Sequence, residues 1–256
     1  MSKIYDAFMF ATELDLLEVR LNILNEYVDY FIVSESNHTH IGTEKPFNFL
    51  ENKKRYKKFE HKIIYNMIED SPMNTDTWGR EVYERNGIIR GLKNCNSNDI
   101  ILTSDADEIP DPKVLSSLNK NNLNGLYLLN QRMFYYYMNV EKDDDWVGTR
   151  LCRFDYLLDH TIDDIREPVR KPGEQRIKNG GWHFSYLGGA DVIRKKIEIY
   201  SHQEYNRDDI KSRIQYNIDN NKDLYGRDTV LRDIHIDESF PEYIRDNYEK
   251  YPHFFK

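Results

Sequence analysis

The chain of 256 residues has little cysteine and no excess of positive charge. Its two cysteines, Cys95 and Cys152, lie far apart, so the sequence indicates neither a disulfide framework nor a zinc site built on paired cysteines. Acidic residues number 44 and basic residues 36, which gives a formal net charge of −8. Because phosphate neutralisation requires a clustered cationic surface, this balance argues against a general nucleic-acid-binding protein.

Long apolar segments are also missing. No run approaches the ~20 residues that a helix needs to cross a bilayer. The first six residues show no apolar core of a secretion signal, and the low cysteine content suits a reducing compartment. The sequence therefore predicts a cytoplasmic protein without a transmembrane segment, and it is long enough to bury a substantial core.

The most informative feature present is an apolar run that ends in acids. Residues 100–102 are Ile-Ile-Leu and predict a short buried strand, with Asp105, Asp107 and Glu108 directly after it. Residues two apart in an extended backbone project to one side, so Asp105 and Asp107 can share a divalent cation. Oxygen ligands of this kind favour Mg²⁺ or Mn²⁺. The alternative is structural, because acids after a strand are also common turn residues and helix caps.

Apolar periodicity predicts an α/β fold with a Rossmann-like mixed sheet flanked by helices. Over the first 110 residues, strand-like runs alternate with helical patterns, as in doubly wound sheets; the predicted strands are 4–10, 27–33, 62–66 and 100–102, and the predicted helices are 14–24 and 77–93. The next part is aromatic and rich in β-formers, which indicates antiparallel or mixed strands at 125–138, 146–154 and 180–186. Beyond residue 191 the pattern becomes polar and mostly helical.

Several motifs, taken in order, resemble those of glycosyltransferase family 17, and the similarity extends from about Tyr5 to the segment 241–248. The matching segments are Glu13-Leu14-Asp15-Leu16-Leu17-Glu18-Val19-Arg20, Val33-Ser34-Glu35-Ser36-Asn37, Asp105-Ala106-Asp107-Glu108-Ile109-Pro110 and Gly181-Trp182-His183-Phe184-Ser185. The resemblance implies a GT-A type fold, a UDP-sugar donor, a divalent metal and inversion at the anomeric carbon. We therefore expect one GT-A domain over residues 1–256, with a nucleotide-sugar-binding half at 1–110, an acceptor-side half at 111–190 and a helical part at 191–256.

The function implied by this resemblance is a metal-dependent inverting transfer of a sugar to a glycan hydroxyl. The characterised member of the family uses UDP-N-acetylglucosamine, so N-acetylglucosamine is the expected sugar. The acceptor stays open among a polysaccharide, a glycolipid and a glycoprotein. A metal held against the diphosphate oxygens would offset the charge of the leaving group.

The expected metal ligands are Asp105, Asp107 and His183, with Mn²⁺ or Mg²⁺ as the ion. Asp107 is the preferred direct ligand, whereas Asp105 has two further possible roles, contacting the ribose or reaching the metal through water. The alternative for His183 is a histidine that is hydrogen-bonded within a packed strand. An inverting transfer also requires a carboxylate base, for which the candidates are Asp191, Glu108 and Glu167.

The expected contacts with the nucleotide sugar come from loops after the first strands and from two larger side chains. These candidates are Glu13, Glu35, Ser36, Asn37, Arg85, Asp105 and Trp182. Arg85 is placed to reach the diphosphate, or else it pairs with Glu81 four residues earlier on the same helix. Trp182 either stacks on a sugar ring or lies in the core. His202 and Glu204 are secondary candidates that a polar helix end explains equally well.

Two other functions are compatible with parts of the sequence. A metal-dependent phosphohydrolase also places Asp-x-Asp after a hydrophobic strand, but it usually has a hydroxyl residue two positions later, where this chain has Ile109. A carbohydrate-binding protein with a degenerate transferase fold is the non-enzymatic alternative. Asp105, Asp107 and His183 together favour the transferase.

Overall fold

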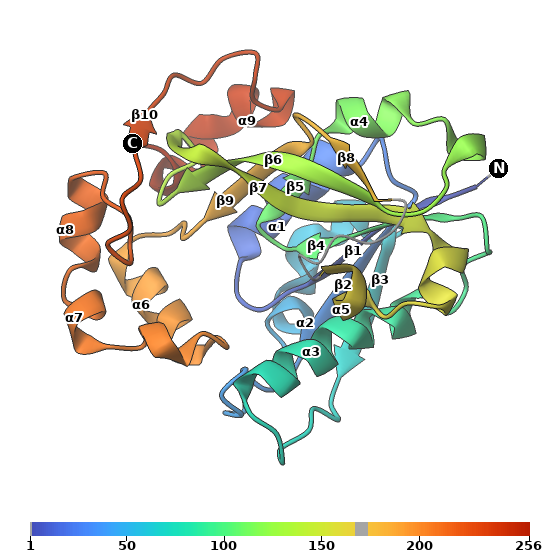
Figure 1. The fold of residues 1–256 in the computed structure, drawn as a ribbon, viewed down its shortest axis with the longest axis horizontal. Helices are drawn as coiled ribbons and strands as arrows, with labels where there is room; N and C mark the ends of the chain where they lie inside the picture. Colours follow the sequence, from blue (N-terminus) through green and yellow to red (C-terminus); the bar gives the residue numbers. More distant parts are fainter. Residues whose placement is uncertain (1, 167–173) are drawn as a thin grey trace.

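A mixed β-sheet forms the centre of the molecule. The computed structural model describes residues 2–166 and 174–256, and over these residues the sheet has ten strands (Figure 1). The strand order is β3-β2-β1-β4-β7-β6-β9-β5, with β10 beside β7 and β8 beside β6. The predicted α/β class, with a mixed sheet flanked by helices, is confirmed.

The N-terminal half of the sheet is parallel and follows the predicted alternation of strands and helices. Its strands are β1 (Ile4–Met9), β2 (Tyr30–Ser36), β3 (Ile63–Ile68) and β4 (Ile100–Asp105), and its helices are α1 (Leu14–Leu24), α2 (Asn48–Asn52) and α3 (Thr77–Gly87). Strand β2 begins at Tyr30 rather than at Tyr27, because the amides of Tyr27 and Val28 donate to the oxygen of Leu24 and extend the turn after α1. Residues 53–59 and 88–92 form 3₁₀ helices.

The second half of the sheet is mostly antiparallel, as the aromatic, β-rich segments predicted. Its strands are β5 (Glu108–Pro110), β6 (Tyr127–Tyr135), β7 (Val140–Arg153), β8 (Gln175–Ile177), β9 (Gly181–Ser185) and β10 (Leu231–Asp233). Strand β7 pairs with β4 on one side and with β6 on the other, and so joins the two halves. The sequence did not predict β5, β8 or β10, which are strands of three residues each, and β10 lies within the part expected to be helical.

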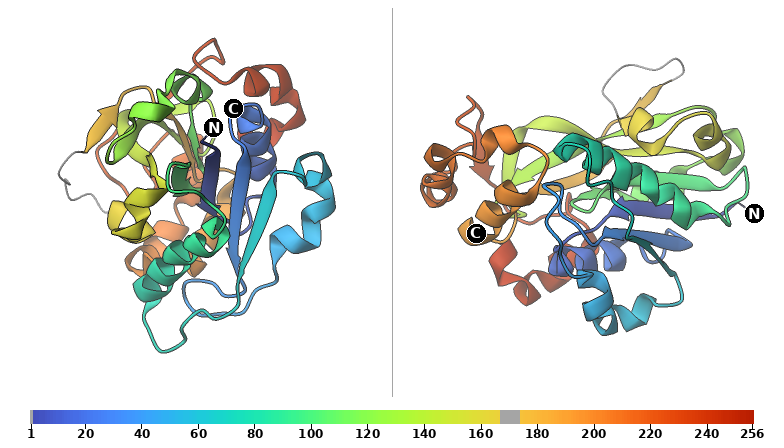
Figure 2. Two further views of the ribbon diagram at one scale, coloured as in Figure 1. Left: turned by 90° about the vertical axis from the view of Figure 1, so that its right-hand side faces the viewer. Right: turned by 90° about the horizontal axis from the view of Figure 1, so that it is seen from below.

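The two faces of the parallel strands pack against different helices (Figure 2). Residues of even number on β1 and β4, such as Phe8 and Leu102, belong to the cluster that includes α1 and α9 (Glu242–Asn247). Residues of odd number, such as Ala7 and Ile101, face the cluster that includes the 3₁₀ helix at 88–92 and α5 (Ile162–Arg166). This alternation follows from the two-residue period of a strand.

The C-terminal part forms a third cluster on the aromatic strands. Helices α6 (Ala190–Ile199), α7 (Asp208–Lys211) and α8 (Ile214–Asp219) lie together at one side of the molecule (Figure 1). Five of their isoleucines are buried in one cluster with residues of β6 such as Tyr135. A short helix, α4 (Pro112–Ser117), follows β5. Among the helices of the described residues, none combines the length and the apolar character needed to cross a membrane.

Candidate active site

The acids that follow β4 lie in a tight turn at the carboxyl edge of the parallel strands. Strand β4 ends at Asp105 and β5 begins at Glu108, and the two residues between them form the turn. The guanidinium of Arg20 donates hydrogen bonds of 2.8–3.2 Å to three backbone oxygens of this turn, those of Asp105, Ala106 and Glu108. The chain thus turns between Asp105 and Asp107, whereas the sequence predicted an extended backbone with both carboxylates on one side.

Arg20 is held by a buried ion pair with Asp6. Both side chains are inaccessible to solvent, and the guanidinium donates to the two oxygens of Asp6 at 2.8 and 2.6 Å. Sequence analysis missed these residues, although the pattern contains a signal. Arg20 lies between Leu17 and Leu24 on the apolar face of α1, and Asp6 lies on the face of β1 that packs against this helix. A charged residue at each of two facing core positions indicates a buried pair.

Asp107 contacts a histidine and a lysine from distant segments. Its Oδ1 atom lies 3.5 Å from Nε2 of His183 on β9, and its Oδ2 atom accepts a hydrogen bond of 3.1 Å from Nζ of Lys196 on α6. Burial opposes ionisation of Asp107, but Lys196 and His183 outweigh it and hold the pKa of this carboxyl well below its usual range. Asp107 is therefore a carboxylate at neutral pH.

Lys196 also brings the loop after β1 into the site. Although burial alone lowers its pKa, the charges of Asp107 and Glu13 raise the pKa of this ammonium group above its usual value. The carboxylate of Glu13 accepts the amides of Ala11 and Thr12 at 3.2 and 2.8 Å, which fixes it at the end of β1. The ends of β1 and β4 thus meet at Lys196, as expected for ligand sites in open α/β sheets.

Arg166 neutralises the other two acids of the turn. Its guanidinium donates to Glu108 at 2.6 Å and to Asp105 at 2.7 Å. Burial opposes the ionisation of Glu108, but Arg166 lowers its pKa to about 2. For Asp105 the burial effect dominates and raises the pKa, with the charge of Glu108 acting in the same direction against that of Arg166.

Buried Arg150 fixes the backbone that carries Arg166. Its guanidinium donates to the backbone oxygens of Ile165 and Arg166 at 3.1 and 2.8 Å. Burial, reinforced by the charge of Arg166, lowers the pKa of Arg150 to about 10. Arg166 therefore approaches the acidic turn from an anchored position.

Trp146 supplies an aromatic surface that the sequence analysis did not single out. Its indole nitrogen donates to the carboxylate of Glu108. The centroid of its ring lies 5.0 Å from the centroid of the His183 ring. The side chain stays 37% exposed. Trp182, the predicted sugar-stacking residue, is only 5% exposed, packs in the core and donates to the backbone oxygen of Ser239. Of the two alternatives for Trp182, the structure shows the core position.

The predicted nucleotide-binding residues after β2 have mostly structural contacts. Glu35 is buried, and its carboxylate accepts from Tyr65, Lys45 and the backbone amides at the start of α2. Ser36 is buried and accepts the amide of His38. Asn37 is half-buried and contacts the ring of His38. These three residues shape the loop at the end of β2.

Arg85 pairs with Glu81, one of its predicted partners, and also with Asp163 on α5. Burial alone lowers its pKa, but the charges of Asp105 and Glu81 and the hydrogen bond to Asp163 raise it. Arg85 therefore lies within electrostatic reach of Asp105.

The remaining candidates differ in their relation to the turn. Asp191 is exposed in the first turn of α6, five residues before Lys196 and thus about 140° around the helix axis. His202 and Glu204 form an exposed pair at 2.7 Å, with His202 against the ring of Trp78. Glu167 lies outside the described residues.

Asp107 and His183 are the described side chains at the turn that could hold a divalent metal in part. Within residues 2–166 and 174–256, no group of three histidine, cysteine or acidic side chains is arranged to hold a metal. Asp107 and His183 face each other, however, and the buried Nδ1 atom of His183 has no partner among the described residues. Mg²⁺-type ions commonly take one or two carboxylates and complete their shell with water and substrate phosphates, and Mn²⁺ accepts such oxygen ligands.

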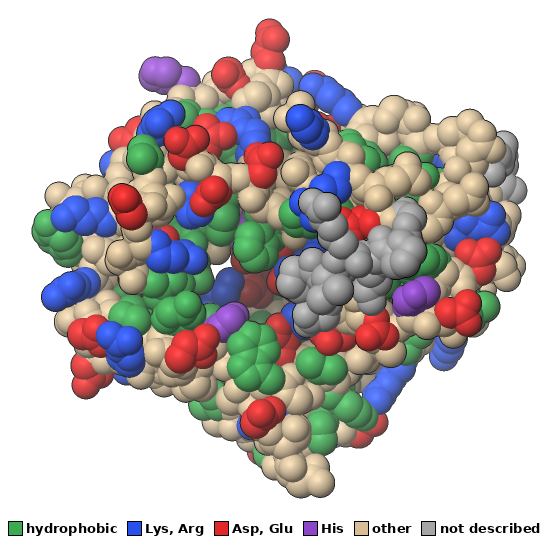
Figure 3. Space-filling model, in the orientation of Figure 1, with side chains coloured by type: hydrophobic (Ala, Val, Ile, Leu, Met, Phe, Trp, Pro, Cys, Tyr) green, Lys and Arg blue, Asp and Glu red, His purple; other side chains and the backbone are tan. Residues whose placement is uncertain are grey.

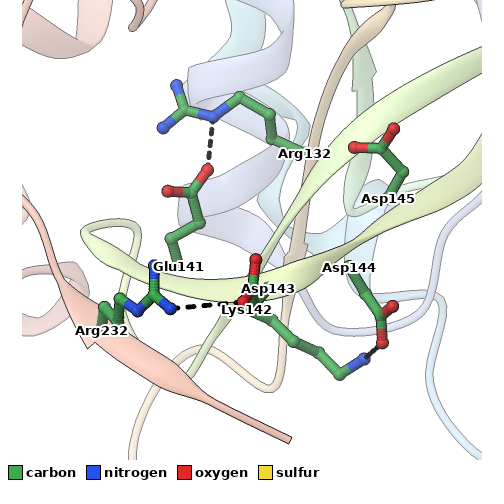
Figure 4. Close-up of a pocket in the computed structure, with 7 residues that line it drawn as sticks. All are labelled: Arg132, Glu141, Lys142, Asp143, Asp144, Asp145 and Arg232. Carbon is green, nitrogen blue, oxygen red and sulfur yellow. Dashed lines mark hydrogen bonds and ion pairs between the residues drawn. The ribbon is translucent and has the colours of Figure 1, made fainter.

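Figure 3, in the orientation of Figure 1, shows a hollow between the C-terminal helices and the sheet, with acidic, basic and hydrophobic side chains around its opening. A separate pocket of about 370 Å³ lies on the β6–β7 hairpin beside β10 (Figure 4). Charged side chains line this second pocket: Arg132, Glu141, Lys142, Asp143, Asp144, Asp145 and Arg232.

Comparison with known proteins identifies the family. The sequence profile of glycosyltransferase family 17 matches residues 1–231, which is most of the chain. The chain belongs to glycosyltransferase family 17. This match favours the transferase interpretation over a phosphohydrolase.

The curated relatives of this family 17 protein include β-1,4-mannosyl-glycoprotein 4-β-N-acetylglucosaminyltransferases. The Rattus norvegicus and Homo sapiens proteins are each 33% identical to it over 117 residues. The match covers 42% of this chain and 22% of each relative. The chain thus matches about a fifth of the length of these relatives.

Solved structures similar to this family 17 chain have low sequence identity. A putative glucose-1-phosphate thymidylyltransferase from Bacillus anthracis shows a TM-score of 0.41 and 11% identity, covering 71% of this chain and 88% of the other. A putative nucleotide-diphospho-sugar transferase from Desulfovibrio desulfuricans G20 shows a TM-score of 0.40 and 9% identity, covering 86% and 96%.

Proposed function

We propose that this protein is a metal-dependent inverting glycosyltransferase that moves N-acetylglucosamine from a UDP-sugar to a hydroxyl of a glycan acceptor. One observation carries the proposal: in a family 17 chain, the turn at Asp105–Glu108 meets His183, Lys196 and Arg166 at the carboxyl edge of the parallel strands. The names of the curated relatives support N-acetylglucosamine as the sugar and a glycan as the acceptor. As predicted from the sequence, a polysaccharide, a glycolipid and a glycoprotein are the acceptor classes to test.

The carboxylates at the turn support the need for a divalent cation. Asp107 is held by Lys196, Asp105 and Glu108 are held by Arg166, and Glu13 interacts with Lys196. A diphosphate brought into this acidic surrounding would meet like charges at short range. Asp107 and His183 would hold Mn²⁺ or Mg²⁺, and the ion would stabilise the leaving diphosphate as a Lewis acid.

The residues of the chain itself have separate tasks in this proposal. Arg166 keeps Glu108 ionised and in place, and Glu108 in turn orients the indole of Trp146. The exposed face of Trp146, beside His183, provides a platform for a sugar ring, since pyranoses stack on aromatic faces. Glu13 and Asn37 border the ends of β1 and β2, where the nucleoside would lie.

For the base we retain Asp191. Of the three predicted catalytic acids, Glu108 is bound by Arg166 and Glu167 lies outside the described residues. Asp191 is exposed, and no hydrogen bond or ion pair involves its side chain among the described residues. A free carboxylate of this kind would take the proton of an acceptor hydroxyl bound within hydrogen-bond distance of it.

Calorimetric titration tests the donor. UDP-N-acetylglucosamine, UDP-glucose, UDP-galactose and GDP-mannose are titrated into the protein with Mn²⁺ and again with a chelator. We expect binding of UDP-N-acetylglucosamine that is lost in the chelator. Absence of binding by any UDP-sugar with Mn²⁺ present would contradict the proposal, and glycan binding without donor binding would favour the carbohydrate-binding alternative.

A further inference from the structure

The contact between the side chains of Lys196 and Asp107 can be broken and formed again. The contact is a hydrogen bond of 3.1 Å from Nζ to Oδ2, and the lysine side chain is 34% exposed. Among the described residues it is the one hydrogen bond that the ammonium group makes to another side chain. The long stem of lysine carries a compact charge that can move without a change in the backbone.

Arg166, the other cation at the turn, is bound much more firmly. It donates to Asp105, to both oxygens of Glu108 and to the backbone oxygen of Gly148, and its side chain is 15% exposed. Several hydrogen bonds would break together if Arg166 moved. Of the two cations, Lys196 is therefore the one that can change partner.

Among the residues that the structure describes, three groups interact with the ammonium group of Lys196. Asp107 lies at one side, Glu13 at the end of β1 stabilises the charge, and the ring of Tyr186 lies 5.6 Å from Nζ. The Asp107 carboxylate is also the preferred ligand for the divalent cation. Oδ2 cannot accept the full charge of both an ammonium group and a divalent ion at contact distance, because the two cations repel each other.

We propose that Lys196 has two alternating partners, Asp107 in the free protein and the diphosphate of the donor when metal and donor are bound. This inference rests on the proposed function. In the free protein the ammonium group compensates the buried charge of Asp107. When a divalent cation is bound at Asp107, Lys196 is released beside the same site and donates to a phosphate oxygen.

Opposite changes in metal affinity and nucleotide affinity test this inference. In Lys196→Met the competing ammonium group is absent, so Mn²⁺ without donor binds roughly fivefold more tightly, as measured by electron paramagnetic resonance of free Mn²⁺. UDP at saturating Mn²⁺ binds roughly tenfold more weakly in calorimetry, because a charge-assisted hydrogen bond is lost. Lys195→Met is the matched control, since Lys195 is exposed on the same helix and has no described partner; both affinities stay unchanged.

Three other outcomes of these titrations would each have a different meaning. If both affinities fall in Lys196→Met, the lysine only supports the structure and the inference is wrong. If Mn²⁺ binds more tightly but UDP affinity is unchanged, Lys196 does not contact the diphosphate, and the inference is again overturned. Failure of the wild-type protein to bind any UDP-sugar with Mn²⁺ would instead remove the proposed function, and the wild type alone reveals it.

Discussion

Acidic residues gather in two regions of this protein, and the two regions differ in burial. In the turn after β4, Asp107 and Glu108 are 9% and 0% exposed, and their carboxylates are held by cations from distant segments. In the pocket on the β6–β7 hairpin, the side chains of Asp143 and Asp144 are each 64% exposed (Figure 4). Their partners are Arg232 from β10 and Lys142 on the same strand.

The comparison shows that a run of acids in a sequence does not by itself indicate a site. Residues 143–145 form the longest such run, yet solvent screens their charges, and exposed ion pairs contribute about 0–1 kcal/mol. A buried carboxylate requires a cation and additional hydrogen bonds, so its orientation is fixed. Fixed orientation is what binding and catalysis require.

The largest expected effect comes from the buried pair beneath the acidic turn. Asp6→Asn leaves the charge of Arg20 without a counter-ion, and we expect a loss of about 3–5 kcal/mol in the free energy of unfolding. Urea denaturation measures this loss in the free energy of unfolding. Asp144→Asn in the exposed pocket is the control, with a change within about 0.5 kcal/mol. Equal effects of the two substitutions would show that burial does not distinguish the regions.

A second prediction concerns pH. Arg166 lowers the pKa of Glu108 to about 2, below the value of an unfolded chain, so the ionised carboxylate stabilises the fold. This contribution is fully present above pH ~4.5 and is lost as the pH falls towards ~2. At pH 7 we expect wild type to exceed Glu108→Gln by up to about 3 kcal/mol in free energy of unfolding, and the gap narrows by pH 3. A gap that is independent of pH would contradict the assigned role of Arg166.

The third prediction compares Asp107 with an exposed acid. Asp107→Asn removes the carboxylate that faces His183, and we expect metal-dependent affinity for UDP-N-acetylglucosamine to fall roughly 100-fold or more. Calorimetry with Mn²⁺ measures the change. Asp144→Asn again serves as control and retains parental affinity. Unchanged donor binding in Asp107→Asn would place the metal elsewhere.

The smallest expected effect is at Trp146. Trp146→Ala removes the proposed platform, and affinity for UDP-N-acetylglucosamine falls roughly tenfold while affinity for UDP alone is unchanged. Trp146→Phe keeps an aromatic face without the hydrogen bond to Glu108, and it recovers part of the loss. If UDP and the UDP-sugar lose affinity equally, Trp146 supports the turn and does not contact the sugar.

Several parts of the fold were predictable because their signals are local. The apolar period of α1 and the short apolar runs of β1 and β4 predicted these elements close to their observed bounds. The 3₁₀ turn after α3 and the late start of β2 were not predicted, because hydrogen bonds at helix ends decide them. The position of the acids at a strand end followed from the sequence alone.

The tertiary structure decided which side chains meet those acids. Lys196 lies 89 residues from Asp107 and Arg166 lies 58 residues from Glu108, so no local spacing links them.

The positions of Trp146 and Trp182 could not be predicted from local spacing either. Both lie on strands, but Trp182 faces the core and Trp146 the site, because sheet pairing decides which face of each strand is covered. The sequence by itself determined the parallel strands, the helices between them and the position of the acids after β4, since those signals are local. The turn itself depends on hydrogen bonds from Arg20, which lies 85 residues before Asp105. Only the tertiary structure brought together the cations and the aromatic ring at the turn, since long-range packing determines those contacts.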